Sequence, residues 1–312
     1  MKKVSPVLLI LSLLATQGLV IGQTVSTPVV GFEKKNFSGG TTGLGVGFVK
    51  PAVFSGSASS LTSSTVTVST ASFGILAASA GLPSYYLEIT SGALIGLVAD
   101  IISNTSTTLT LDADLSTILG TTPTVAIRPH VKVSGLFQGN ASLTDYIDTV
   151  TVYNADGTST SLLRDSSAAT GWVRNDTFEA SDLVVYPGQA VLLSVSQNGS
   201  VTISGQVKTT PTLVPLYAGS LNYVTLGNPS NGQSIQSVNL GSNMTDYIDT
   251  VTKLSTDGNC SQTGVFLWGG AADGFLDVNT FSPVTETVPG TDAIFVSVSS
   301  DTYWKAPAPL TP

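Results

Sequence analysis

The chain is poor in cysteine, histidine and charged residues. Among its 312 residues there is one cysteine, Cys260, and one histidine, His130. A single cysteine cannot close an internal disulfide, and it excludes a cysteine-based zinc site. A single histidine excludes a metal site built from several histidines. The side chains on which metal and nucleophilic chemistry usually depend are therefore scarce.

The few charges are mainly negative. Charged residues make up 10% of the chain, with 12 Lys and Arg against 20 Asp and Glu and a net charge of −8. A nucleic-acid interface needs clustered Lys and Arg to neutralise phosphates, whereas these basic residues are scattered. The same acidity disfavours an anionic membrane surface. We therefore expect no nucleic-acid partner.

Thr, Ser, Val, Gly and Leu dominate the rest of the sequence. β-branched residues suit a pleated surface, and Gly and Ser suit turns. Hydrophobic residues make up 42% of the chain, so it can bury a core, and disorder is disfavoured. Alternating segments run through the sequence, and no stretch keeps a period of 3.6 residues. These patterns predict an all-β fold.

The N-terminus has the pattern of a secretory signal peptide, over residues 1–22. Two lysines follow Met1, Val7–Leu14 is apolar, and Gly22 suits the cleavage position. The alternative is a membrane anchor, but Pro6 and Gln17 leave an apolar run below the roughly 20 residues that a span needs. No second apolar segment follows. We expect an exported protein without a membrane span in its mature chain, extracellular or on the cell surface, with the periplasm as the alternative.

One segment of the chain occurs twice. Residues 144–151 read Thr-Asp-Tyr-Ile-Asp-Thr-Val-Thr, and residues 245–252 repeat them without a change. From its tyrosine onward each copy is β-branched and alternating, which predicts a strand. Each copy then leads to a tight-turn signal, Asp156-Gly157 in the first and Asp257-Gly258 in the second, so each predicts a β-hairpin. The offset between the copies is about one hundred residues, a usual domain size. The duplication predicts two related antiparallel β-sandwich-like units.

The first copy is longer than the second, which predicts an inserted module. We expect the first unit to be discontinuous, over residues 23–54 and 130–208, and the second to cover 209–305, with a tail at 306–312. The insertion, residues 55–129, contains short strand-like segments joined by turns, as in a small β-barrel. These segments are Thr65–Ser69, Tyr85–Ile89, Gly96–Ile102, Thr107–Leu111 and Thr124–Ile127.

Several stretches resemble a known group of sequences. They are Tyr85–Gly92, Ile127–His130, Gly171-Trp172, and Tyr186–Gln189 leading to Gly205–Val207. With these stretches the chain resembles a family of uncharacterised exported β-rich proteins that occurs as multiple paralogues in verrucomicrobia and some other bacteria. The resemblance covers most of the mature chain and implies export and β-rich architecture. It implies no activity and no catalytic residues.

The sequence does not assemble a catalytic site. A Ser-His-Asp triad would need His130 as its base, but the position of this residue favours a structural or surface role. A glycosidase needs two carboxylates across a cleft, and among the scarce glutamates only Glu179 is a candidate. Trp172 and Trp268, one in each copy, could form a sugar-binding platform. We favour a buried tryptophan in each core, because aromatic residues carry much of a small core's burial.

The duplicated aspartates are the best candidates for a metal site. Asp145 and Asp148 in the first copy, and Asp246 and Asp249 in the second, could bind Ca²⁺ together with loop carbonyls. A spacing of three places two side chains on opposite faces of an extended strand, where they cannot hold one ion. We favour a role in closing turns through bonds from backbone N–H groups. No metal and no cofactor is therefore expected.

These features favour a non-enzymatic function outside the cytoplasm. We expect a structural, surface or adhesion protein that makes β-mediated contacts with copies of itself or with extracellular polysaccharide. The main alternative is a carbohydrate-binding module or a carbohydrate-active enzyme that uses a carboxylate pair. A third possibility is an assembly module stabilised by Ca²⁺.

Overall fold

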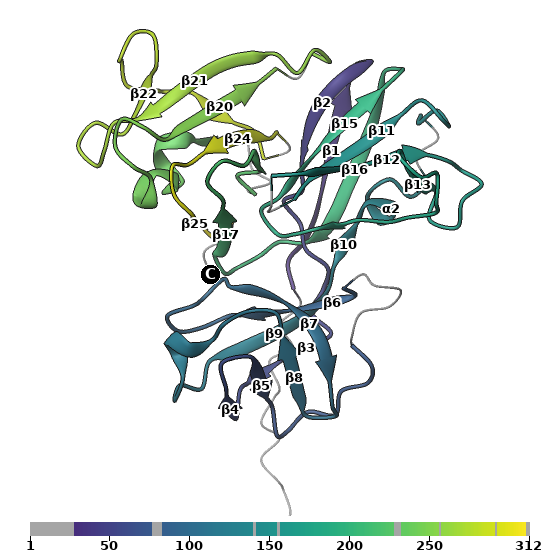
Figure 1. The fold of residues 1–312 in the computed structure, drawn as a ribbon, viewed down its shortest axis with the longest axis vertical. Helices are drawn as coiled ribbons and strands as arrows, with labels where there is room; N and C mark the ends of the chain where they lie inside the picture. The colour runs from purple at the N-terminus through teal and green to yellow at the C-terminus, as the bar shows by residue number, and fades with distance from the viewer. Residues whose placement is uncertain are drawn as a thin grey trace, which may run out of the picture.

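The regular structure of the chain is almost entirely β-strand. The computed structural model describes residues 28–76, 83–139, 142–154, 157–227, 232–255, 257–290 and 292–309. Within these residues every helix has three or four residues, whereas strands run through all parts of the chain (Figure 1). The all-β prediction is confirmed. The predicted leader, residues 1–22, lies outside the described residues.

The first unit pairs a five-stranded antiparallel sheet with a long two-stranded ribbon. Its elements are β1 (Val30–Phe37), β2 (Gly40–Gly45), β10 (Val131–Lys132), α2 (Val133–Leu136), β11 (Thr149–Tyr153), β12 (Ser159–Arg164), β13 (Trp172–Arg174), β14 (Val184–Val185), β15 (Ala190–Val195) and β16 (Gly199–Gln206). The sheet has the order β13-β12-β11-β15-β2, and β1 pairs with β16 to form the ribbon. A short pair, β10-β14, completes the unit.

The second unit has the same plan. Its elements are β17 (Thr212–Leu216), β18 (Asn222–Val224), β19 (Gln233–Ser234), η2 (Ile235–Ser237), η3 (Leu240–Asn243), β20 (Thr250–Leu254), β21 (Gln262–Trp268), β22 (Phe275–Asp277), β23 (Thr287–Val288), β24 (Ile294–Ser297) and β25 (Thr302–Ala306). The sheet order is β22-β21-β20-β24-β18, the ribbon is β17-β25, and the short pair is β19-β23. Each strand of the second unit thus has a counterpart in the first.

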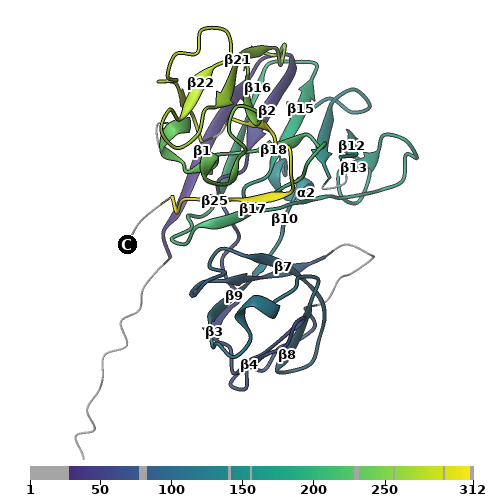
Figure 2. The same ribbon diagram turned by 60° about the vertical axis from the view of Figure 1, so that its left-hand side comes forward.

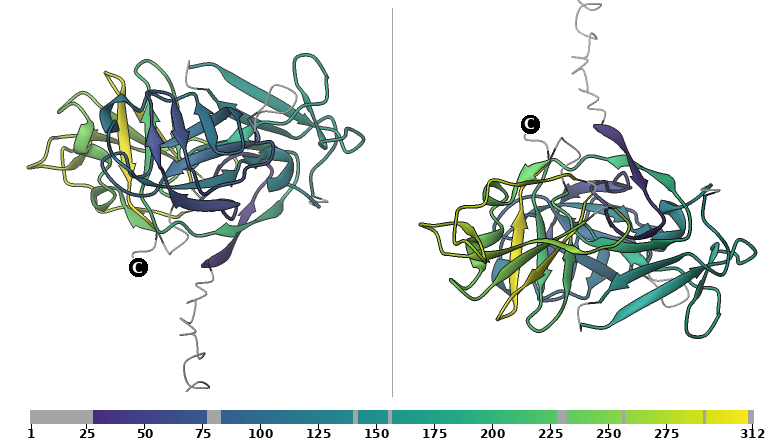
Figure 3. Two further views of the ribbon diagram at one scale, coloured as in Figure 1. Left: turned by 90° about the horizontal axis from the view of Figure 1, so that it is seen from below. Right: turned by 90° about the horizontal axis from the view of Figure 1, so that it is seen from above.

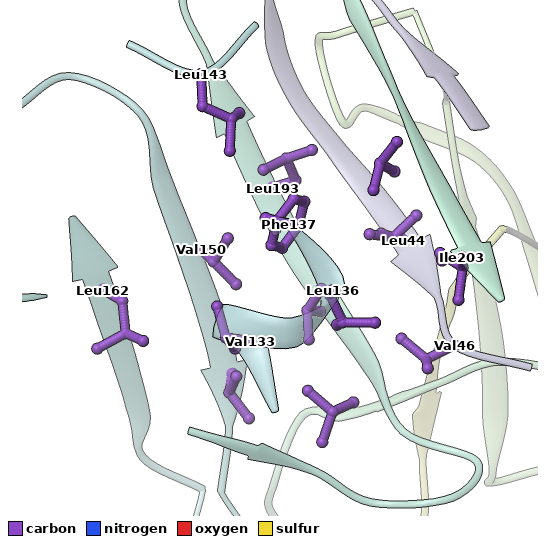
Figure 4. Close-up of a cluster of buried hydrophobic side chains, with 14 of the residues drawn as sticks. Leu44, Val46, Val133, Leu136, Phe137, Leu143, Val150, Leu162, Leu193 and Ile203 are labelled. Atoms are coloured by element: carbon purple, nitrogen blue, oxygen red, sulfur yellow. The ribbon is translucent and has the colours of Figure 1, made fainter. Parts of the chain in front are cut away.

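The core of the first unit lies between its sheet and its ribbon, as in a sandwich. Alternation along β11 buries Val150 and Val152 and leaves the threonines partly exposed. These valines join Ile203 of the ribbon and Leu136 and Phe137 of the α2 segment in one cluster (Figure 4). Full burial of such a side chain contributes roughly 1.5–3 kcal/mol, so this shared face holds the two layers together.

A curled seven-stranded sheet interrupts the first unit between β2 and β10. Its elements are β3 (Phe54–Ser57), β4 (Ser60–Leu61), β5 (Thr65–Thr67), β6 (Tyr85–Ile89), β7 (Val98–Asn104), β8 (Thr108–Leu111), η1 (Ser116–Ile118) and β9 (Thr124–Pro129). The strand order is β3-β9-β6-β7-β8-β5-β4, and the sheet encloses its own apolar cluster. The predicted fold class, two related sandwich-like units with an inserted barrel-like module, is confirmed.

The two units lie side by side, and the inserted module lies beneath their junction (Figures 2 and 3). Glycine makes the close approach of the two units possible. A Cβ atom on Gly43 of β2 would stand 2.0 Å from the hydroxyl oxygen of Tyr223 in the second unit. Gly40 has a φ of +119°, and its neighbour Thr41 donates a backbone hydrogen bond to Gly258 of the second unit at 2.5 Å. An ion pair between Lys35 and Asp292 joins the same units.

A buried carboxylate fastens the inserted module to the chain that links the two units. Glu88 of β6 has no exposed surface. It pairs with Nε of Arg128 on β9 at 2.8 Å and with Nζ of Lys208 in the linker at 2.8 Å. The hydroxyl of Thr210, also in the linker, donates to Glu88 at 2.5 Å. Although burial acts to raise it, Lys208, Thr210 and Arg128 hold the pKa of Glu88 below its ordinary value.

The same network reaches the first unit through Arg128. Its Nη1 donates to the carbonyl oxygen of Lys50, which follows β2, at 3.0 Å, and to the side chain of Gln206 at the end of β16 at 2.8 Å. A backbone bond from Leu213 to the carbonyl of Gly96, 3.0 Å long, holds the turn between β6 and β7 against the second unit. The module is therefore held against both units.

The duplicated segment is a turn followed by a strand, which corrects the expectation of a strand from the tyrosine onward. Strand β11 begins only at Thr149, and Tyr146 before it has a φ of +60°. The second copy is the same, with β20 beginning at Thr250 and a φ of +57° at Tyr247. A positive φ is strained for a bulky residue, so the surrounding contacts must impose it.

The second aspartate of each copy supplies those contacts. Asp148 is buried, and its carboxylate accepts backbone N–H bonds from Thr144 at 2.8 Å and from Ser196 at 2.7 Å. In the second unit Asp249 is 2% exposed and accepts the equivalent bonds from Thr245 at 2.7 Å and Ser299 at 2.8 Å. Each aspartate thus ties its turn to the end of the neighbouring strand. The expectation that these residues close turns agrees with this geometry.

Replacing Glu88 by Gln should destabilise the protein, because the two buried cations Arg128 and Lys208 would lose their shared carboxylate. We expect a loss of about 3–5 kcal/mol, measured by urea unfolding. The depressed pKa adds a pH signature: the contribution of Glu88 is complete above its unfolded pKa of about 4.3 and disappears as the pH falls through the lower folded value. Exposed Glu179, changed to Gln, is the control. Equal stability of both variants would refute this assignment.

Replacing Asp148 by Ala should cost more stability than replacing Asp145 by Ala three residues earlier. The first change leaves two backbone N–H groups without their acceptor, at about 1–3 kcal/mol each when they are buried. Asp145 is partly exposed, and its acceptor role toward Ser166 can be taken by water. Thermal unfolding of the two variants measures the difference. Asp249→Ala and Asp246→Ala should repeat the same order in the second unit, and the reverse order in either unit would contradict the role assigned to Asp148 and Asp249.

Candidate functional site

Trp172 lies in the core, so it cannot serve as a sugar-binding platform. Its side chain is 1% exposed and packs against Phe137, with 5.6 Å between the ring centroids. The strand register also corrects the pairing of Trp172 with Trp268. Trp172 pairs with Arg164 across β12 and β13, whereas Trp268 pairs with Phe275 across β21 and β22. The counterpart of Trp172 is therefore Phe275.

Trp268 is half-buried and takes the place that Arg164 holds in the first unit. Its ring centroid is 4.9 Å from that of Phe275, and the guanidinium of Arg164 lies 5.7 Å from the centroid of Trp172. The two units thus cover the same buried aromatic position differently, one with a cation–π contact and one with an aromatic pair. A role of Trp268 in ligand binding stays a prediction.

The geometry does not bring the duplicated aspartates together as calcium ligands. Both oxygens of Asp148 and of Asp249 accept backbone N–H bonds. Asp145 accepts hydrogen bonds from Ser166, and its Oδ1 lies 3.8 Å from Nε of Arg164. Among the described residues there is no group of three or more His, Cys, Asp or Glu side chains suited to a metal ion.

A cleft opens where the two units and the inserted module meet. Its volume is about 520 Å³. The module contributes Asp100 and Asp112, the first unit contributes residues 152–154 and 183–189, and the second unit contributes residues 213–224. This volume is within the range of small-molecule sites, roughly 300–1,000 Å³. Each wall comes from a different part of the chain, so the cleft exists only in the assembled fold.

The chain's only histidine stands behind this cleft. His130 is 4% exposed, and its Nε2 lies 2.9 Å from Oδ1 of Asp100. The other oxygen of Asp100 accepts a 2.6 Å bond from the hydroxyl of Tyr186 in the first unit. The ring of His130 also contacts Tyr86 and Tyr186, at centroid distances of 4.9 and 5.2 Å. The contacts of His130 join the module to the first unit, as expected of a structural residue.

Tyr186 is not a ready nucleophile. Burial, and then its hydrogen bond to Asp100 and the charge of that residue, raise the pKa of Tyr186. The phenol therefore stays protonated and acts as a donor that orients Asp100. The chain of contacts from Tyr186 through Asp100 to His130 positions a carboxylate, and it contains no serine or cysteine.

Asp112 is the second carboxylate of the cleft. Its Oδ1 accepts a 2.7 Å bond from the backbone N–H of Asp100, which sets the two side chains close together. Partial burial and then the charge of Asp100 raise the pKa of Asp112. A pair of neighbouring carboxyl groups is one arrangement that enzymes use for acid–base catalysis. Such a pair also suits the binding of hydroxyl or ammonium groups.

Tyrosines supply the aromatic part of the apolar lining of the cleft, and Val, Leu and Pro residues supply the rest. Tyr153, Tyr217 and Tyr223 line it together with Tyr186. Tyr223 is buried: it stacks on Phe295 at 4.4 Å and lies 5.7 Å from the ring of Tyr153 of the first unit, so it is anchored in the interface between the two units. The side-chain amide of Gln189 donates a 2.7 Å hydrogen bond to the carbonyl of Tyr153, which holds these two segments of the cleft together. The cleft is therefore a preformed surface of aromatic rings and carboxylates.

No linear pattern of the sequence pointed to this cleft. Asp100 falls on a strand of the inserted module and Asp112 directly after the next strand, and Tyr217 lies in a part of the second unit without a recognisable motif. Glu179, the carboxylate favoured from sequence, lies in an exposed turn after β13 and outside the cleft lining. Asp100 belonged to the predicted strand Gly96–Ile102, and Tyr186, Pro187 and Gln189 to the stretch Tyr186–Gln189, but neither stretch was marked for binding.

Comparison with known proteins adds no functional assignment. No family model, no curated protein and no solved structure matches the chain. The resemblance to a family of exported β-rich proteins therefore stays a prediction. None of the described helices has the length and apolar character that a membrane crossing requires.

Proposed function

We propose that this protein is an exported, non-enzymatic surface or adhesion protein that holds extracellular polysaccharide in the cleft between its three parts. The observation that carries the proposal is the cleft itself, with tyrosine rings from two units facing carboxylates from the third part. Sugar rings have apolar faces that stack on aromatic side chains, and hydroxyl groups that donate to carboxylates. The cleft offers both kinds of contact at once.

Preorganisation supports a binding role. Asp100 is held by His130 and Tyr186, and Asp112 is held by the backbone of Asp100. Side chains that are already fixed lose little conformational entropy when a ligand arrives. The buried network around Glu88 keeps the module in place against both units, so the cleft needs no ordering before it binds.

Export is supported by the predicted leader and by the composition of the chain. Residues 1–22 have the pattern of a secretory signal, and few charged residues follow. Attachment at a surface through a bound polysaccharide needs no membrane anchor. Contact with further copies of the chain through strand edges is compatible with this role.

One observation favours a carbohydrate-active enzyme as a second candidate function. Asp112 has a raised pKa and lies beside Asp100, which makes it a candidate general acid. A glycosidase requires a protonated carboxyl group and an ionised one on two sides of the scissile bond. The two carboxyl groups here come from strand β7 and from the end of the neighbouring strand β8 in one sheet, which suits joint contact with one ligand group better than placement on two sides of a bond.

Changing Tyr217 to Ala should weaken polysaccharide binding, because the cleft would lose an aromatic face. A loss of about five- to tenfold in affinity corresponds to one ring-stacking contact of about 1 kcal/mol. A glycan array followed by calorimetry on the best oligosaccharide measures it. Tyr217→Phe keeps the ring and should retain binding, and Tyr247→Ala, an exposed tyrosine outside the cleft, is the control. Wild-type binding by Tyr217→Ala would refute the placement of the ligand.

Incubation with the bound oligosaccharide should release no new reducing ends, since we propose that the protein binds without hydrolysing. The comparison is wild-type protein against Asp112→Asn, which keeps an oxygen acceptor for the backbone of Asp100 but cannot act as an acid. Release by the wild type that is lost in Asp112→Asn would replace the binding proposal by the enzymatic candidate. We expect that neither protein releases reducing ends and that both retain binding.

A further inference from the structure

The charges in the cleft are all of one sign. Among the described residues that line it, Asp100 and Asp112 are the charged side chains, and there is no Lys, Arg or His. Three partly or fully exposed tyrosines, Tyr153, Tyr186 and Tyr217, also line it, and tyrosine ring faces carry partial negative charge. A ligand that enters the cleft therefore meets a negative potential from two carboxylates and from the rings around them.

The two carboxylates are not neutralised equally. Asp100 has contacts with His130 and with the hydroxyl of Tyr186. Asp112 accepts a backbone bond from Asp100, and within the described part of the chain no Lys or Arg forms an ion pair with it. The ion pairs of the described Lys and Arg side chains are all made elsewhere: Lys35–Asp292, Arg128–Glu88, Lys208–Glu88, Arg164–Asp145, Arg174–Asp176 and Lys253–Glu286.

The second unit adds to this potential at the opposite wall. Burial raises the pKa of Tyr217, and the charges of Tyr303, Asp301 and Asp112 raise it further. Asp301 is fixed near this position by a 2.8 Å bond from the backbone N–H of Ala218. Tyr217 thus lies between negative groups of the module and of the second unit. A positive charge beside its ring would interact favourably with both groups.

We infer that the cleft selects a saccharide that carries a protonated amine, with the ammonium group at Asp112 and the sugar ring on Tyr217. This inference rests on the proposed function, since it names the ligand class of the same cleft. An ammonium group donates charge-assisted hydrogen bonds to a carboxylate, and it is attracted to the faces of tyrosine rings. It would supply the cation that Asp112 lacks.

The same arrangement rejects an anionic polysaccharide. A uronic acid or a sulfated sugar would bring a third negative charge into a partly buried space that already holds two carboxylates. No lining Lys or Arg among the described residues offsets that repulsion. Discrimination between charge classes therefore follows from an unfavourable contact as well as from a favourable one. A neutral sugar is tolerated, but it gains no ionic contact.

Calorimetry with two tetrasaccharides of equal length tests the inference. One is a glucosamine tetramer with free amines, and the other is its fully N-acetylated form, which is neutral. We expect the amine form to bind the wild-type protein about tenfold more tightly at low salt, because one charge-assisted contact is gained. Raising the salt concentration should reduce this preference, since partly exposed charges are screened.

Variants locate the charge contact. Asp112→Asn should bring the affinity for the amine form down to that for the neutral form, while the affinity for the neutral form changes little. Asp176→Asn removes the same charge from an exposed position of the first unit and should leave the preference intact. Thermal unfolding of both variants verifies that they remain folded.

The outcomes separate this inference from the function on which it rests. Tighter binding of the amine form that is lost only in Asp112→Asn supports the inference. Equal or tighter binding of the neutral form overturns the amine preference and leaves the polysaccharide function standing. The inference also falls if the preference persists in Asp112→Asn. If neither these tetrasaccharides nor any array glycan binds, the proposed function and the inference both fail.

Discussion

The arrangement of the three parts depends on the buried carboxylate of Glu88. An ionised group without exposed surface is tolerated only when its charge and its hydrogen-bond acceptors are satisfied, and here a strand of the same module and the interunit linker both contribute. Arg128 extends the network to the carbonyl that follows β2 and to the end of β16. A displaced module would leave these charges unpaired in an apolar surrounding. The network therefore favours one arrangement over the many that apolar contacts alone would allow.

The two related units contain the same hydrogen-bonded turn, although the side chains that pack around it differ. In each unit a buried aspartate ties a left-handed tyrosine to the end of the neighbouring strand, with nearly the same hydrogen-bond lengths. The covering of the buried aromatic residue differs, because Arg164 stands where the second unit has Trp268. A turn held by backbone donors is insensitive to the side chains packed around it. The sequence segment is therefore identical in both units because the same turn requires it, whereas the residues of the two cores differ.

The fold was predictable from sequence because its signals are local. The five strand-like segments expected in residues 55–129 correspond to β5, β6, β7, β8 and β9, and the identical segments at 144–151 and 245–252 anchor the two units. Two errors came from local patterns, one of alternation and one of spacing, that were taken without their contacts. Tyr146 alternates like a strand residue, yet the capping by Asp148 turns the chain there. Trp172 was aligned with Trp268 by spacing, and only the register reveals Phe275 as its counterpart.

The cleft was not predictable in this way, because it results from long-range placement. Asp112 becomes distinctive only when Asp100 lies beside it and Tyr217 of the second unit closes the opposite wall. A contact between residues so far apart leaves no local pattern in the sequence. The overall acidity, however, has a consequence that sequence alone leaves open. A net charge of −8 spread over a surface is a matter of solubility, whereas two carboxylates focused in a cleft without a lining Lys or Arg among the described residues select ligands by charge. The position of the charges, more than their number, turns an acidic β-protein into a candidate receptor for a cationic saccharide.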